Sequence, residues 1–104
     1  KLQGANLDNT NLGGANLRLV NLRNARLSEA DLTTADLTEA DLRQANLQQA
    51  KLGGADLISA DLRAADLSYA DLSGANLTNA KIGGANLQSA KLTGAIMPDG
   101  STHE

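Results

Sequence analysis

The sequence predicts an all-β solenoid, in which short straight segments alternate with tight turns and stack on one another. Leu recurs at every fifth position from Leu2 to Leu77, and apolar residues continue this series to Met97. Ala stands two residues before these positions in all but two units, and Asp or Asn fills most of the positions between. The repeated unit is therefore Ala-Asp/Asn-Leu-x-x, with no insertion along the series.

The spacing of five fits neither regular secondary structure over the length of the chain. On an α-helix, each step of five would rotate the next Leu by about 140°, so the leucines would circle the axis without forming one apolar stripe. On a flat strand, side chains alternate between faces, and an odd spacing would place successive leucines on opposite faces. Neither a long helix nor a long strand is therefore predicted.

Each unit taken alone has the pattern of a very short strand followed by a turn. Ala and Leu point inward and the Asp or Asn between them points outward. The two remaining positions hold turn residues such as Gly13-Gly14, Gly53-Gly54 and Gly83-Gly84, and Gly tolerates a positive φ. A straight side and a corner, repeated without drift, close into coils that stack at a strand spacing of about 4.8 Å.

This repeat resembles that of the pentapeptide-repeat family over residues 1–97, and the closing segment 95–104 is similar to the ends of cyanobacterial members. The resemblance implies a right-handed quadrilateral β-helix with four units per coil, about five coils in all. Coils of three units are not excluded by the periodicity itself. We expect a solenoid domain over residues 1–97 and a C-terminal tail over 98–104, which begins where Pro98 stops the repeat.

The leucines of the middle units are the predicted core, with the alanines two residues before them. Fully burying one Leu contributes about 1.5–3 kcal/mol. The predicted core leucines are Leu22, Leu27, Leu32, Leu37, Leu42, Leu47, Leu52, Leu57, Leu62, Leu67, Leu72 and Leu77.

The composition argues against several classes of function. The chain of 104 residues has no Cys, and its one His, His103, lies in a tail that we expect to be flexible. No Ser or Thr has a His base nearby, and there is no phosphate-cradling loop. The net charge of −3 and the single aromatic residue do not favour nucleic-acid binding. We therefore expect no enzyme, no cofactor and no metal.

Two features of the outward positions are candidate contact surfaces. Arg23, Arg43 and Arg63 follow one another at intervals of 20, so four-unit coils would stack them into a column that could receive an anionic partner. The alternative is that Asp41 and Asp61, two residues before Arg43 and Arg63, neutralise them. Tyr69 is the only aromatic residue, and exposed Tyr often anchors interfaces, although isolated surface aromatics also occur.

Acidic residues would also stack in four-unit coils. Asp36 would lie over Asp56, and Asp41 over Asp61, and such pairs could bind a hard cation or raise one another's pKa. The alternative is that Asp or Asn is needed there for local hydrogen bonding at the turn. A further column alternates in sign and is typical of a cross-strand charge ladder. Its members are Asp31, Lys51, Asp71 and Lys91.

We expect a non-enzymatic structural or protein–protein interaction domain with a protein partner that the sequence does not identify. Lys1 and Leu2 begin in register, so we interpret the chain as a fragment of a longer protein, with membrane association through an upstream segment as one option and a cytoplasmic protein as the other. The first coil could instead remain exposed or stack end to end on another molecule. No apolar run approaches the length of a membrane span. The family's quinolone-resistance members suggest a DNA-mimic inhibitor of a topoisomerase as an alternative, and cation binding by stacked carboxylates is another.

Overall fold

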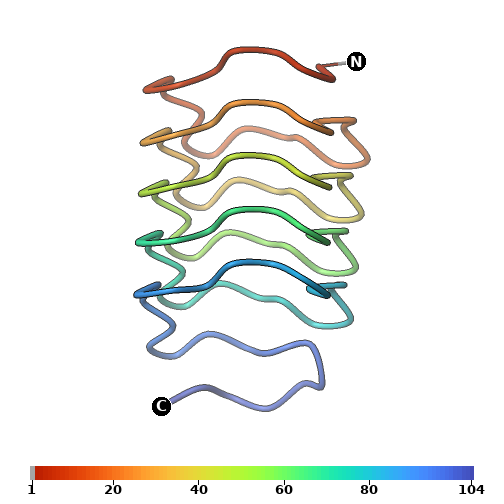
Figure 1. The fold of residues 1–104 in the computed structure, drawn as a ribbon. Coiled ribbons are helices and arrows are strands. Elements are labelled where there is room, and N and C mark those ends of the chain that lie inside the picture. The colour runs from red at the N-terminus through yellow and green to blue at the C-terminus, as the bar shows by residue number, and fades with distance from the viewer. Residues whose placement is uncertain (1) are drawn as a thin grey trace.

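A computed structural model describes residues 2–104, and the chain winds as a right-handed, four-sided β-solenoid (Figure 1). Every parallel β-bridge joins residues 20 apart, as between Asn21 and Asp41, so one coil contains four units. Within residues 2–104, β-structure is limited to single-residue bridges and there is no helix. The predicted quadrilateral β-helix is confirmed, and coils of three units are excluded.

Most backbone groups of a unit pair with the coils on either side. In the unit 41–45, the N–H of Asp41 donates to the carbonyl of Val20 (2.9 Å), one coil back. The N–H of Leu42 donates to the carbonyl of Asp61 (2.8 Å), one coil forward. The same pattern recurs along the chain, so that backbone hydrogen bonds hold each coil to its neighbours.

Each unit ends in a tight turn that forms the corner of the coil. The N–H of Ala45 donates to the carbonyl of Leu42 (3.0 Å), and Gln44, the third residue of this turn, has a φ of 61°. A positive φ at the third residue defines a type II turn, for which Gly and Asn are the residues of lowest cost. Seven of the positive-φ residues are Gly and three are Asn, while others carry larger side chains.

The Asp/Asn column has a specific structural task. The N–H of the second turn residue has no backbone partner, and the side chain two residues earlier accepts it: Asp41 Oδ1 lies 3.2 Å from the Arg43 nitrogen. The same bond runs from Thr38 to Asp36 and from Ile58 to Asp56. The predicted role of this column in local hydrogen bonding is therefore what the structure shows.

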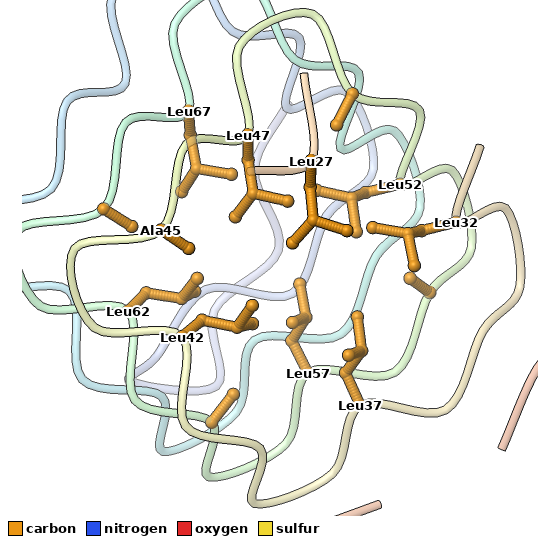
Figure 2. Close-up of a cluster of buried hydrophobic side chains, with 14 of the residues drawn as sticks. Leu27, Leu32, Leu37, Leu42, Ala45, Leu47, Leu52, Leu57, Leu62 and Leu67 are labelled. Carbon is orange, nitrogen blue, oxygen red and sulfur yellow. The ribbon is translucent and has the colours of Figure 1, made fainter. Parts of the chain in front are cut away.

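The core consists of stacked leucines that converge on the axis, with alanines at the corners. Figure 2 shows Leu27, Leu47 and Leu67 in one ladder, facing Leu37 and Leu57 across the interior. All twelve predicted core leucines are buried, with at most 3% of their surface exposed. Ala fits beside them because the sides are short and leave no room for a larger inward residue.

The leucines of the two terminal coils are less well covered. Leu2, Leu7, Leu12 and Leu17 at the N-terminal end are only partly buried, because the described chain places a coil on one side of them alone. Partial burial recurs at the other end, where Ala95 is the exception and is fully buried beside the C-terminal hairpin. The partly buried residues there are Ile82, Ala85, Leu87, Ala90, Leu92 and Met97. The buried core is therefore contributed by the middle coils.

The C-terminal residues form an antiparallel hairpin, which differs from the flexible tail that the sequence suggests. The chain reverses at Gly100, whose φ is 87°. Beyond this turn, Thr102 forms an antiparallel bridge with Ile96. The N–H of His103 donates to the carbonyl of Ala95 (2.7 Å), and the carbonyl of His103 accepts from Gly94 (2.8 Å). The tail thus pairs with backbone groups at the edge of the last coil. In the middle of the solenoid, the next coil pairs with these groups.

Candidate functional site on the arginine face

One side of the solenoid carries the three predicted arginines in register, and we call it the arginine face. It comprises residues 2–5, 21–25, 41–45, 61–65 and 81–85, as the 20-residue bridges and the backbone bonds of Leu2 and Gly4 to the unit 21–25 require. An open groove of about 320 Å³ runs along it. The residues that line this groove are Arg23, Arg43, Gln44, Arg63 and Ala64.

Two of these arginines are paired within their own units. Arg43 donates from Nε to Asp41 Oδ1 (2.9 Å) and from an Nη atom to Oδ2 (2.7 Å). Arg63 makes the same two-pronged contact with Asp61, at 2.9 and 2.6 Å. Arg43 also lies 3.6 Å from Asp61 in the next coil. The predicted neutralisation of Arg43 and Arg63 by these aspartates therefore matches the geometry.

Arg23 differs from the other two because Asn21 stands where they have Asp. Asn21 Oδ1 accepts the backbone N–H of Arg23 (3.1 Å), as the aspartates do in their units. Within residues 2–104, no carboxylate lies within 4.0 Å of the Arg23 guanidinium. The Nε of Arg23 is enclosed and has no hydrogen-bond partner among these residues.

Three of the aspartates in these columns, Asp36, Asp41 and Asp61, are held in their charged form. The side-chain hydrogen bond from Arg43 lowers the pKa of Asp41, and the bond from Arg63 lowers the pKa of Asp61. The side-chain hydrogen bond from Thr38 lowers the pKa of Asp36. For these three carboxylates, the suggestion that stacking raises the pKa is therefore wrong, because hydrogen bonds to the charged form outweigh the desolvation that would raise the pKa.

The alternating charge column is present, but its members do not form close ion pairs. Asp31 bridges to Lys51, and Asp71 bridges to Lys51 and Lys91 along the sheet. In the described part of the chain, no carboxylate–ammonium distance in this column is within 4.0 Å. Asp31 Oδ1 accepts the N–H of Thr33 (3.0 Å) instead, so the column acts only through longer-range attraction.

Tyr69 lies on a different side from the arginines. It is 60% exposed and belongs to the unit 66–70, on the next side of the coil after the unit of Arg63. Leu19 is the other large exposed apolar residue, whereas Ile58 and Ile96, which the sequence also places outward, are half-buried. The structure therefore groups the three arginines and leaves Tyr69 apart from them.

Asn21 was not predicted from the sequence as part of the candidate site. The signal was available: in the column of Asn21, Asp41 and Asp61, the first lacks the charge that the Arg two residues later requires. Within residues 2–104, no group of three His, Asp or Glu side chains converges as ligands around a metal ion would. Nor does this part of the chain contain a helix long and apolar enough to cross a bilayer.

Comparison with known families and proteins bears on the whole repeat region. A family model described as pentapeptide repeats matches residues 1–39, 40–79 and 70–98. No curated protein sequence matches significantly.

Solved structures with the same architecture include proteins from a cyanobacterium and a plant and a plasmid-mediated resistance protein. A pentapeptide repeat protein from Nostoc PCC 7120 is 40% identical, with a TM-score of 0.55, over 88% of this chain and 64% of its own. One from the Arabidopsis thaliana thylakoid lumen is 30% identical, with a TM-score of 0.60, over 99% of this chain and 72% of its own. QnrB1, a plasmid-mediated fluoroquinolone resistance protein, is 23% identical with a TM-score of 0.59, over 92% of this chain and 57% of its own, a likeness of fold alone. The chain thus spans 64% of the length of the Nostoc protein.

Proposed function

Because the chain belongs to the pentapeptide-repeat family, we propose that it is a non-enzymatic interaction module whose side wall binds a protein partner, with Tyr69 as the anchoring residue. The observation that carries this proposal is the combination of exposure and backbone conformation at Tyr69. Its side chain is 60% exposed, and its φ is 61°.

The fold does not account for a Tyr at this position. The corner requires only a positive φ, which Gly adopts freely and Asn tolerates, whereas a bulky residue is strained there by about 1–2 kcal/mol. A residue that is 60% exposed gains little burial to offset that strain, but Tyr is enriched among the residues that dominate binding energy at interfaces. A strained and exposed aromatic residue is therefore a candidate for function.

The proposal can be tested by separating stability from binding. Tyr69→Asn relieves the backbone strain and removes the ring, so we expect a melting temperature at least as high as that of the native chain. Gln49→Asn is the matched control, because Gln49 has a φ of 60° in the same corner one coil earlier. It receives the same relief without the loss of an aromatic residue.

Binding is measured with a photo-crosslinking amino acid in place of Ser89, which lies in the same corner one coil after Tyr69. In extracts of the cells that make this protein, we expect a saturable adduct that Tyr69→Asn weakens about tenfold or more and Gln49→Asn preserves. An adduct that is insensitive to Tyr69→Asn, or no adduct, would contradict the proposal. An adduct with a topoisomerase would support the DNA-mimic alternative.

A further inference from the structure

The groove of the arginine face contains one guanidinium whose hydrogen-bonding capacity the described residues do not use. We propose that Arg23 and Asn21 form a binding site for a carboxylate of a protein partner. The Asn21 amide fills the position that Asp41 and Asp61 occupy toward Arg43 and Arg63, so the site takes an acidic side chain from the groove, against the Arg23 guanidinium. This inference concerns a different side of the solenoid from Tyr69 and does not depend on the proposed function.

Hydrogen-bond donors and acceptors are balanced in the unit of Asp41 and not in the unit of Asn21. In the unit of Asp41, one carboxylate oxygen accepts from the backbone and Nε of Arg43, and the other accepts from its Nη atom. In the unit of Asn21, the single side-chain oxygen accepts the backbone N–H of Arg23. The other terminal atom of Asn21 is an amide nitrogen, which donates and cannot accept. Arg23 and Asn21 therefore present an excess of donors.

Burial makes the unused donor of Arg23 costly. The Arg23 Nε is enclosed and has no partner among residues 2–104. A buried donor that lacks an acceptor costs about 1–3 kcal/mol, more when it is charged. Because Nε is enclosed, an oxyanion in the groove would reach it only after a shift of the Arg23 side chain, and it would then remove this cost and gain charge-assisted hydrogen bonds.

The arginine face also carries a local positive charge. The chain as a whole carries a net charge of −3, yet the arginine face holds three arginines and Lys81 against only Asp41 and Asp61. Arg23 attracts Asp41 in the neighbouring coil without contacting it closely, and this attraction contributes to the lowered pKa of Asp41. The groove is therefore a positive region on an acidic molecule, which steers an acidic partner toward this side.

The geometry favours a carboxylate over other anions. Arg43 and Arg63 each hold a carboxylate in a two-pronged contact at 2.6–2.9 Å, one and two coils from Arg23. The planar fork of Arg matches a carboxylate with two parallel hydrogen bonds. Arg23 belongs to the same column and has the amide of Asn21 in place of that carboxylate.

The test uses the Nε–Hε signals of the five arginines in nitrogen-15 NMR spectra of the whole chain. The chain is titrated with sodium acetate, with inorganic phosphate and with sodium chloride at equal ionic strength. We expect acetate to shift the Arg23 signal progressively while the signals of Arg43 and Arg63 stay fixed. The guanidinium groups of Arg43 and Arg63 already bind the carboxylates of Asp41 and Asp61. Exposed Arg18 reports non-specific binding.

Two variants that add the same charge separate the site from general electrostatics. Asn21→Asp places a carboxylate where the neighbouring units have one, so we expect the Arg23 signal to move toward those of Arg43 and Arg63. The affinity for acetate should then fall at least about tenfold, since a hydrogen bond to a charged group is lost. Asn24→Asp adds its charge at the exposed corner of the same unit and should reduce the affinity less than about threefold.

Several results would overturn the proposal. The native Arg23 signal could already coincide with those of Arg43 and Arg63 and ignore acetate, which would show that the fork is filled. Phosphate or chloride could shift it as much as acetate, which would remove the preference for a carboxylate. Equal losses of acetate affinity in Asn21→Asp and Asn24→Asp would show that net charge alone causes the loss.

Discussion

Asp8 supplies Ser28 with the hydrogen-bond acceptor that the unit of Ser28 lacks. Arg26 occupies the Asp/Asn position in that unit and cannot accept the N–H of Ser28. Asp8, one coil back, accepts it through Oδ1 at 2.8 Å and receives a hydrogen bond from Arg26 through Oδ2 at 2.6 Å. A carboxylate in one coil thus satisfies the backbone of the next and neutralises the residue that caused the deficit.

This relationship predicts a dependence between two substitutions. Asp8→Ala should lower the free energy of unfolding by about 1–2 kcal/mol, because it removes two hydrogen bonds at once. In an Arg26→Asn background, the introduced amide oxygen would accept the N–H of Ser28 locally, and the cost of Asp8→Ala should fall below about 0.5 kcal/mol. Urea unfolding of the native chain, the two single variants and the double variant gives the coupling free energy between the two positions. Equal costs of Asp8→Ala in both backgrounds would show that Asp8 does not replace a missing acceptor at position 26.

A second prediction concerns the core ladders. Leu47→Ala should cost about 2–5 kcal/mol, because Leu47 is fully buried and its neighbours are fixed by the repeat, so the cavity cannot collapse. Gln48→Ala, one residue later and exposed, should cost less than about 1 kcal/mol. Thermal unfolding of both variants decides the point. Equal melting temperatures would be incompatible with the inward assignment of Leu47.

A stabilising substitution is expected at Lys51. Its side chain has no acceptor for the N–H of Gly53, the position that Asp or Asn serves in most units. Lys51→Asn should raise the free energy of unfolding by about 0.5–1.5 kcal/mol by adding that bond. Lys51→Gln is the control, since it removes the same charge but places its oxygen one bond too far. If both variants change stability equally, the charge of Lys51 and not the missing acceptor is the cause.

The stability of the chain should depend on pH in the acid range. Hydrogen bonds to the charged form lower the pKa of seven carboxylates below the ordinary value of 3.8, so these groups stabilise the folded state at neutral pH. That stability should be nearly constant from pH 7 to about 5 and decline as the pH falls through about 4 and below, when the unfolded chain takes up protons first. The residues concerned are Asp31, Asp36, Asp41, Asp61, Asp66, Asp71 and Asp99.

Melting temperatures measured across this range provide the check. Asp61→Asn keeps the acceptor for the N–H of Arg63 and removes the titrating group, so its melting temperature should fall less steeply with acid than that of the native chain. A native melting temperature that rises below pH 4 would have the wrong sign for depressed pKa values.

The inward positions were predictable from the sequence because the fold imposes them in every unit. Leu47 and Ala45 follow from spacing and size alone. The contact of Asp8 with Ser28 was not predictable in the same way, because it depends on which residue lies in the adjacent coil, 20 positions away. The coil length itself required the family resemblance, since a period of five is compatible with three or four sides. The hairpin at His103 was missed because its residues show no alternation of apolar and polar side chains.

The coil of 20 residues and the unit of five give the molecule two different tolerances to insertion. One extra unit placed after Ala65 would keep every later Leu and Ala inward, so the core would lose little. It would also move every later outward residue by a quarter turn, and Tyr69 would leave its column with Gln49 for the next corner. Whole units can therefore be gained or lost to rearrange the surface while the interior is conserved. Such a protein can acquire a new arrangement of contacts by changing its length, without changing any residue that it already has.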